Sequence, residues 1–563
     1  MMRFHRALPR GVMPPFRAYS SLPPFKPTTG PPRYLGHTLA ALGAVGIYAA
    51  VQRHRHRPVV EPTTAFDGTP GTIWEELEPC IKLTMPLGPY GTSDYTTFTQ
   101  PYLPLGACFD FLHKLEESHE VKREGSPIAK WQANVLPGND ACEDRHAVDW
   151  ISRDDLPRLG RSGGFWKNWF EAKNQQEGDG RRDLMFFSVW DGHSGSEWSD
   201  LAKRTLHACL AWTLSTSTVG ERLFSVTDTQ PATMRDKIAQ LLSATISAFD
   251  ANVLAAPLDV LRGRISSPQP AILPSPPPAL LKLSSGERAG TCGLTAVVDV
   301  ENDDLYIANI GDCRAVAGWY NPKEGVWRCD TLSQDLMGDN PNEAEKVRSV
   351  HPEEEHDNVL FCAGWGDRIM GMMQPTRSLG DAHWKRSVED DARIRDECQE
   401  DVWTCDGIHL TPPYVLSAPD ITHRKLHPSN GESLKFLILS TDGLWDRLSS
   451  EEATLLLAGY LNDPAQGHVP KTSLPQEIHF SAPPQERPFP VEPLPGTKAS
   501  DANATWAFEG DDNAATHLIK NSLAGGDLRH RHRVLSLRGR MGKLLRDDVT
   551  SLVVFFDEDE SEN

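Results

Sequence analysis

Acidic residues follow several short apolar runs in this sequence, at positions where β-strands are expected to end. Three runs of strand length lead into an acid: 185–190 into Asp191, 305–310 into Asp312 and 436–441 into Asp442. Further acids accompany them: Glu143-Asp144 upstream, Asp446 one helical turn after Asp442, and Asp547-Asp548 ahead of the apolar run 552–556. A single strand that ends in Asp-Gly is most often a plain turn, but this recurrence indicates one cluster. Clustered carboxylates are tolerable only around cations, and oxygen ligands without a Cys/His set favour Mg²⁺ or Mn²⁺ over zinc.

Length and charge limit the classes of protein that the chain can represent. Its 563 residues fit one large catalytic domain with insertions, which we place at 100–556. The net charge of −20, from 57 Lys and Arg against 77 Asp and Glu, argues against nucleic acid as the main partner. Ten cysteines stand at scattered spacings with no Cys-x-x-Cys pair, which indicates reduced thiols rather than a disulfide framework.

The N-terminal region has the composition of a targeting segment. Residues 1–60 contain nine Arg or Lys and no acid, and we interpret 1–33 as a mitochondrial presequence. The apolar stretch 34–51 follows, with arginines on both sides. Eighteen helical residues rise roughly 27 Å, enough for the core of a bilayer, so a single transmembrane helix is predicted. The alternative is a longer presequence that is cleaved; 52–99 is then expected to be a linker.

The elements that must position the acids can be outlined from periodicity. An apolar stripe predicts a helix over 231–249, and another helix is expected over 199–214. Strands at 294–300 and 305–310 are joined by the polar turn 301–304, and 340–348 should be a polar helix. Three segments are expected to lie outside the strands and helices of the catalytic domain. They are the insertions at 255–288 and 462–505 and the acidic tail 557–563.

Seven motifs in this order resemble the metal-dependent protein phosphatase family (PPM, or 2C type). They are Glu143-Asp144, Asp191-Gly192-His193-Ser194-Gly195, Gly290-Thr291-Cys292-Gly293, Gly311-Asp312-Cys313-Arg314, Thr376-Arg377-Ser378-Leu379-Gly380-Asp381, Asp442-Gly443-Leu444-Trp445-Asp446 and Arg546-Asp547-Asp548. Within the family, the chain resembles the mitochondrial pyruvate dehydrogenase phosphatase branch. That likeness rests on the stretches 512–519 and 411–414 and on His351-Pro352 ahead of Arg368.

The resemblance implies an α+β fold, a four-layer αββα sandwich of two antiparallel sheets flanked by helices. It also implies a centre of two Mg²⁺ or Mn²⁺ ions at one edge, bound by Asp191, Asp442 and Asp547, with the Gly192 carbonyl as a further ligand. Glu143 and Asp144 should lie close by, and Asp312 and Asp446 match positions that hold an additional metal in some members. Two cations would lower the pKa of the attacking water and neutralise the phosphoryl oxygens.

The residues expected to act on the substrate follow from the same motifs. His193, beside Asp191, is placed to protonate the leaving serine or threonine oxygen; the alternative is a turn histidine with a structural hydrogen bond. Many members hold phosphate with an arginine four residues before the Glu of Glu143-Asp144, where this chain has Asn139. Phosphate binding is therefore expected from the metals, from the Asn139 position and from Arg145.

Two alternatives to a metal-dependent phosphatase are compatible with parts of the sequence: a cysteine phosphatase and a non-enzymatic scaffold. Cys362 and Arg368 satisfy the Cys-x5-Arg spacing of cysteine phosphatases, but Asp367 would bring negative charge into that phosphate loop. A catalytically weak, membrane-tethered pseudophosphatase scaffold is the non-enzymatic alternative. Degenerate members should lack ligand aspartates, and all of these acids are present here.

The branch resemblance implies a phosphoprotein partner, the E1 alpha subunit of pyruvate dehydrogenase. The apolar stretch 34–51 is expected to hold the domain at the inner membrane of the mitochondrion. A stop in transfer at 34–51 would place the domain in the intermembrane space, whereas that complex lies in the matrix. Either 34–51 is not a permanent anchor, or the substrate is another protein.

Overall fold

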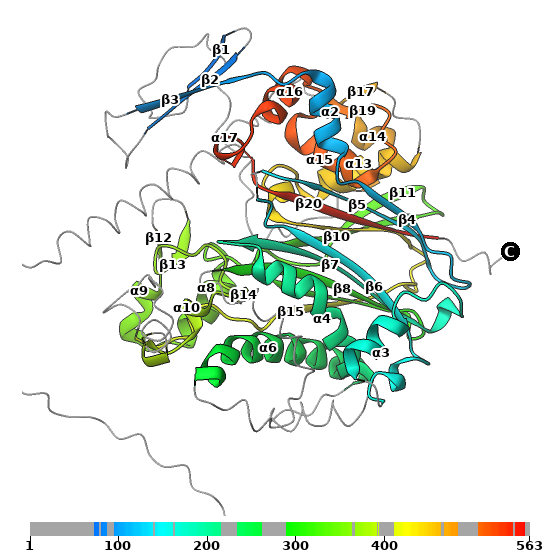
Figure 1. The fold of residues 1–563 in the computed structure, drawn as a ribbon. Helices are drawn as coiled ribbons and strands as arrows, with labels where there is room; N and C mark the ends of the chain where they lie inside the picture. Colours follow the sequence, from blue (N-terminus) through cyan, green and yellow to red (C-terminus); the bar gives the residue numbers. More distant parts are fainter. Residues whose placement is uncertain are drawn as a thin grey trace, which may run out of the picture. The chain divides into compact units, whose positions relative to one another are not determined.

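The computed structural model describes most of the chain after residue 72 (Figure 1). The described ranges are 73–77, 80–86, 95–138, 141–161, 164–215, 233–261, 289–362, 366–390, 392, 410–462, 467–481, 505–543 and 546–557. All of them belong to the compact unit Val45–Asn563. The expected presequence at 1–33, the transmembrane helix at 34–51, residues 262–288 of the first insertion and most of the acidic tail lie outside the described residues.

Two large sheets form the centre of the fold. The first has the order β18 (Phe480–Ser481), β11 (Val326–Thr331), β10 (Arg314–Asn321), β16 (Ser433–Ser440), β20 (Val549–Phe556), β5 (Ile128–Leu136) and β4 (Glu117–Glu120). The second has the order β15 (Asp420–Lys425), β9 (Asp304–Ile310), β8 (Gly290–Asp299), β7 (Asp183–His193) and β6 (Arg145–Ser152), with β14 (Leu379–Gly380) also paired to β8. Neighbouring strands are antiparallel, apart from the parallel pair of β11 and β18.

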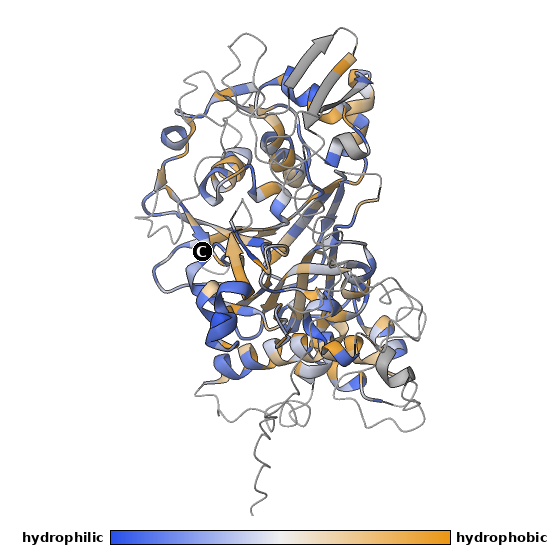
Figure 2. Ribbon diagram, turned by 90° about the vertical axis from the view of Figure 1, so that its left-hand side faces the viewer, coloured by the Kyte–Doolittle hydropathy of each residue, from blue (hydrophilic) through white to orange (hydrophobic). Residues whose placement is uncertain are grey.

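The apolar run in β7 reflects burial on both faces of its sheet. Successive side chains of a strand point to opposite faces. One set fills the core between the two sheets: Met185, Phe187 and Val189. The alternate set packs with the covering helices: Leu184, Phe186 and Trp190. Figure 2 shows the same hydrophobic character in the central strands of the molecule.

Helices cover the outer face of each sheet, so the expected four-layer αββα sandwich is confirmed (Figure 1). The second sheet is covered by α4 (Glu197–Ser215) and α6 (Met234–Leu261), whose buried side chains share one core with β7. The first sheet is covered chiefly by α13 (Ser450–Asn462) and α15 (Ala514–Ala524), with α2 (Leu105–His113) and α16 (Leu528–Ser536) beside them. The helices predicted at 199–214 and 231–249 correspond to α4 and α6, and the hairpin at 294–310 corresponds to β8 and β9.

A separate lobe, which we call the flap, lies beside the end of β8 (Figure 1). It contains α8 (Pro341–Ser349), α9 (His356–Val359), β12 (Leu360–Cys362), β13 (Asp367–Ile369) and α10 (Ala382–Lys385). A small core of its own holds it together, including Val347, Ile369 and Tyr414. Asn340 caps α8 by accepting from the amides of Asn342 and Glu343, and α8 is the polar helix predicted at 340–348.

Parts of the sequence expected outside the framework contain regular structure. The predicted linker 52–99 includes strands that pair as β1 (Ile73–Leu77), β2 (Cys80–Pro86) and β3 (Tyr95–Pro101). The predicted insertion 462–505 contributes β18 to the first sheet, β17 (Gly467–Pro470), which pairs with β19 (Thr505–Phe508), and α14 (Leu474–Glu477). The first insertion also begins later than expected, because α6 continues to Leu261. The partner of β18 lies far away in the sequence, so local composition could not predict that strand.

In the described part of the chain, one helical segment is long and apolar enough to cross a membrane. This segment is Met234–Ala256. Its apolar side chains Leu242, Ile246, Phe249 and Val253 are buried in the core shared with α4 and β7. This segment is therefore a core helix of the domain.

Candidate active site

The end of β7 approaches the Glu143 loop closely. β7 pairs with β8 up to its last residue, with Gly192 opposite Thr291 and His193 opposite Gly290. The Thr291 hydroxyl donates to the Asp191 carbonyl at 2.9 Å. A Cβ on Gly192 would lie 2.4 Å from the carbonyl oxygen of Glu143. Only glycine therefore allows the loop to pack here.

Three of the predicted acids converge at this edge. Asp191 at the end of β7, Asp312 after β9 and Asp442 at the start of α12 (Asp442–Trp445) each place a carboxylate oxygen within 4.8 Å of the others. Asp312, which the resemblance assigned to an additional metal, thus lies in the same group as the two principal ligands. A cation that contacts all three would have the oxygen ligands that Mg²⁺ and Mn²⁺ prefer.

The carboxylates raise one another's pKa, as expected of a cluster that binds cations. Burial, followed by the negative charges of Asp442 and Asp144, raises the pKa of Asp191 well above its usual range. Burial likewise raises the pKa of Asp312 to about 6. Asp547 adds to the repulsion at Asp191 and Asp144, which places its charge near the cluster. Divalent cations would reverse this repulsion by favouring the charged forms.

The Glu143-Asp144 loop is held by a carboxylate that does not belong to the group of three. Asp548 accepts from the backbone amides of Gly138 at 2.6 Å and Glu143 at 2.7 Å. Asp144 accepts from the Thr441 hydroxyl at 2.8 Å through Oδ2. Its Oδ1 is buried and has no hydrogen-bond partner among the described residues. An orphaned carboxylate oxygen beside the cluster fits a metal ligand, so the residues present suit a divalent cation.

His193 lies between the acidic cluster and the flap. Its Nε2 is 2.8 Å from Oδ2 of Asp381. Burial disfavours the charged imidazole, but the adjacent Asp381 outweighs it, so the pKa of His193 is raised. The charges of Asp312 and Glu143 raise this pKa further, so both acids lie near the ring. A histidine that holds a proton beside the cluster could donate it to a leaving group.

Comparison with known proteins agrees with this geometry. The Protein phosphatase 2C family matches residues 279–464. Over that range the chain is similar to the protein phosphatase 2C family, and the site described above fits a phosphatase of that type. The chain is therefore a serine/threonine phosphatase of the 2C type, a class that depends on metal.

Individual relatives are similar over different lengths. Pyruvate dehydrogenase (acetyl-transferring) phosphatase 1, mitochondrial, of Saccharomyces cerevisiae is 29% identical over 79% of this chain and 71% of its own. A protein phosphatase 2C homolog of Schizosaccharomyces pombe is 29% identical over 79% of this chain and 84% of its own. Pyruvate dehydrogenase (acetyl-transferring) phosphatase 2, mitochondrial, of Homo sapiens is 31% identical over 47% of this chain and 48% of its own, so the match spans about half of the human protein.

The phosphate contact of Arg145 stays a prediction, and in the structure its guanidinium is bound to the protein itself. Its Nε donates to Asp200 at 2.6 Å, and its NH1 donates to the carbonyls of Cys142 at 2.8 Å and Asp144 at 2.7 Å. The guanidinium therefore fastens the Glu143 loop to α4. Asn139 lies outside the described residues. Asp446 is the C-cap of α12 and does not belong to the group of three.

The described residues around Cys362 give the cysteine mechanism no structural basis. Cys362 is exposed on β12 and pairs with Asp367 of β13, while Phe361 pairs with Arg368. The buried Arg368 donates to the Met372 carbonyl at 3.3 Å and to Gln374 Oε1 at 2.7 Å. Its guanidinium is thus directed into the flap rather than around the thiol. All cysteines in the described part of the chain are free, as expected for reduced thiols.

We expect Cys362→Ser to retain hydrolysis of a phosphoserine peptide within about twofold of the wild-type kcat, because the reaction needs no thiolate. Steady-state kinetics with Mn²⁺ would measure this. A chelator should silence both proteins. A Cys362→Ser variant that folds and binds Mn²⁺ but is inactive would restore the thiol mechanism.

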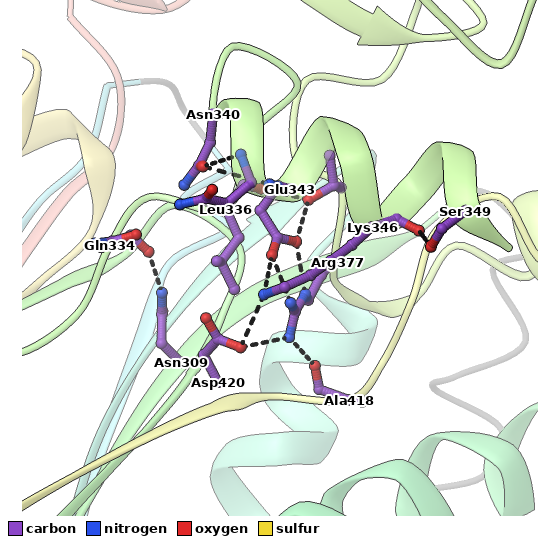
Figure 3. Close-up of polar contacts among 12 residues, drawn as sticks. Asn309, Gln334, Leu336, Asn340, Glu343, Lys346, Ser349, Arg377, Ala418 and Asp420 are labelled. Carbon is purple, nitrogen blue, oxygen red and sulfur yellow. Dashed lines mark hydrogen bonds and ion pairs between the residues drawn. The ribbon is translucent and has the colours of Figure 1, made fainter. Parts of the chain in front are cut away.

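A buried ion pair fastens the flap to the sheet edge (Figure 3). Arg377 binds Glu343 of α8 through two bonds, Nε to Oε2 at 2.8 Å and NH2 to Oε1 at 2.6 Å. Its NH1 donates to the Ala418 carbonyl at 2.7 Å and lies 3.1 Å from Asp420 of β15. The side chains of Arg377 and Glu343 are 6% and 1% exposed, so the pair is shielded from water. Arg377 begins the segment that carries Asp381 to His193.

Asp381 and Asp548 are the site residues whose roles the sequence reasoning missed. Asp381 is the last residue of the motif that begins at Thr376. The sequence therefore contained it in a recognised motif but did not show that it contacts His193. Asp548 was noted only as standing where asparagine is common. The pairings of both residues, with His193 and with the Glu143 loop, join segments far apart in the sequence.

Proposed function

We propose that this phosphatase is mitochondrial and removes phosphate from serine on the E1 alpha subunit of pyruvate dehydrogenase. The observation that carries the phosphatase chemistry is the convergence of Asp191, Asp312 and Asp442 beside His193. The choice of substrate rests on the names of the relatives, because a metal site does not select one phosphoprotein.

Two Mg²⁺ or Mn²⁺ ions would be held by Asp191, Asp442, Asp547 and the Gly192 carbonyl, with Glu143 and Asp144 close by. Asp312 and Asp446 could hold a third. When bound, the ions lower the pKa of the attacking water and neutralise charge on the phosphoryl group. His193 protonates the departing serine oxygen. The scaffold alternative predicts missing ligand acids, whereas three carboxylates meet here within 4.8 Å.

The N-terminal 1–33 would direct import, and 34–51 would hold the domain at the inner membrane or be removed with the presequence. Activity on E1 alpha requires the domain to reach the matrix. Substrate choice would then come from the surface outside the metal cluster, where the part of 462–505 that packs on the first sheet is one candidate.

Cells that lack this protein should accumulate phosphoserine on E1 alpha. Wild-type protein should reverse the accumulation, and Asp442→Asn should not, because the variant lacks one carboxylate of the cluster. Phosphosite-specific detection of E1 alpha would measure both. Unchanged E1 alpha phosphorylation in the deletion strain would exclude this substrate and leave the phosphatase chemistry in place.

A further inference from the structure

Asp381 is a buried carboxylate that contacts the proton donor instead of the acidic cluster. The residue is 3% exposed. Its Oδ2 accepts from His193 Nε2 at 2.8 Å and from the Ser378 hydroxyl at 2.5 Å. His193 comes from the end of β7 and Asp381 from the flap, 188 positions later. The contact therefore exists only in the folded domain.

The backbone around Asp381 is built for this contact. Asp381 has a left-handed backbone, with φ at 52°, which costs free energy for any residue with a side chain. A Cβ on Gly290 would lie 2.1 Å from Asp381 Oδ2 and 2.5 Å from His193 Nε2. Glycine at 290 thus leaves the room in which the carboxylate and the imidazole meet. Strain and close approach at one contact indicate a functional constraint.

A second buried carboxylate holds the same segment from the other side. Asp250 of α6 accepts from the Gly380 amide and from Lys385 Nζ, both at 2.7 Å. Lys385 also donates to the Ser378 carbonyl at 2.7 Å. The segment 378–385 is therefore fixed independently of His193, and the Asp381 carboxylate is presented to the imidazole by a rigid support.

We propose that Asp381 is a positioning residue, which orients His193 and keeps the Nε2 proton on the side of the flap so that Nδ1 serves the substrate. This inference rests on the role of His193 in the proposed function. As the water oxygen bonds to phosphorus, the bond from phosphorus to the serine oxygen breaks. That oxygen takes the Nδ1 proton, and the imidazole becomes neutral while Nε2–H stays bound to Asp381. The logic is that of a carboxylate that holds a catalytic imidazole in one tautomer.

The test compares two substrates with different leaving groups in Asp381→Asn. Asparagine has nearly the same shape and tolerates the left-handed backbone, but it lacks the charge and can turn its NH2 group toward Nε2. We expect kcat for a phosphoserine peptide to fall roughly 10-fold to 10²-fold, within the usual contribution of a general acid. For p-nitrophenyl phosphate, whose leaving group needs no proton, kcat should stay within about twofold. Equal losses on both substrates would overturn the inference.

Two further variants separate the outcomes. His193→Gln should show the same dependence on the leaving group, and the double variant should be no slower than His193→Gln alone, because both residues act through one proton. If His193→Gln shows this dependence and Asp381→Asn does not, the positioning role fails while the proposed function stands. If His193→Gln slows both substrates equally, the general-acid role is wrong, and the inference fails with it.

Asp250→Asn is the matched control. It removes a carboxylate that is equally buried and that holds the same segment, but whose hydrogen bonds go to Gly380 and Lys385. Its effect should be a lower Tm and, because Asp381 keeps its charge, a smaller difference between the two substrates than in Asp381→Asn. Titration calorimetry with Mn²⁺ should give Asp381→Asn the wild-type affinity; weakened binding would make Asp381 part of the metal site and overturn the positioning role.

Discussion

Asp442→Asn is expected to lower the rate of Mn²⁺-dependent hydrolysis of a phosphoserine peptide by at least ~10²-fold. Asp442 shares a group of three carboxylates with Asp191 and Asp312, whose oxygens lie within 4.8 Å of one another. The substitution keeps the shape of the side chain and removes one negative ligand from a dication. Steady-state kinetics over a range of Mn²⁺ concentrations, with calorimetry of Mn²⁺ binding, would measure the loss.

The stability of the metal-free protein separates this effect from misfolding. Asp442 is one of the charges that raise the pKa of Asp191, so its neutralisation relieves repulsion and should not lower the Tm without metal. The stabilisation that Mn²⁺ gives the wild type should disappear in the variant. Asp154→Asn, at an exposed ion pair with Arg182, is the control and should leave both quantities unchanged. A near-normal rate in Asp442→Asn would refute the assignment of the metal centre.

Glu343→Gln is expected to reduce the free energy of unfolding by about 3–5 kcal/mol, because it leaves the Arg377 guanidinium buried without its main partner. Both side chains are almost fully buried, and two short hydrogen bonds join them (Figure 3). Urea denaturation at pH 7 would measure the change. Because the flap carries Asp381, activity on phosphoserine should fall as well.

The neighbouring Lys346 supplies the control for this ion pair. Lys346 binds the same carboxylate at 2.8 Å, but its side chain is 50% exposed, so Lys346→Met should cost no more than about 1 kcal/mol. The effect of Glu343→Gln should also shrink in acid. Burial favours the neutral carboxyl, but Arg377 and Lys346 together outweigh it and lower the pKa of Glu343. The pair therefore stabilises the fold above the usual pKa of a glutamate, and this stability is lost as the pH falls through the lowered value. Equal losses in Glu343→Gln and Lys346→Met would show that the pair is not a buried clamp.

The sequence by itself determined which acids form the cluster, and its resemblance to the 2C type predicted the layers of the fold. β7 and β8 are buried on both faces, so they appear in the sequence as continuous apolar runs that can be found without a structure. Asp191, Asp312 and Asp442 stand directly at the ends of such elements, and the direction of each strand carries its acid to the same edge. The stripe of α6 likewise followed from its helical period, because local periodicity reports which face is buried.

Only the tertiary structure decided which side chains and strands pair with residues far away in the sequence. The bond between Arg145 and Asp200 of α4, for example, forms only because the fold brings α4 to the start of β6. Asp381 gained a role because folding places the flap beside the end of β7, and β18 became a strand because β11 offers it a partner. Such pairings depend on contacts between residues far apart in the chain, and their free energy appears only when the intervening chain is folded. Residue type and local spacing do not reveal which distant residues will meet, so these roles could not be predicted from the sequence.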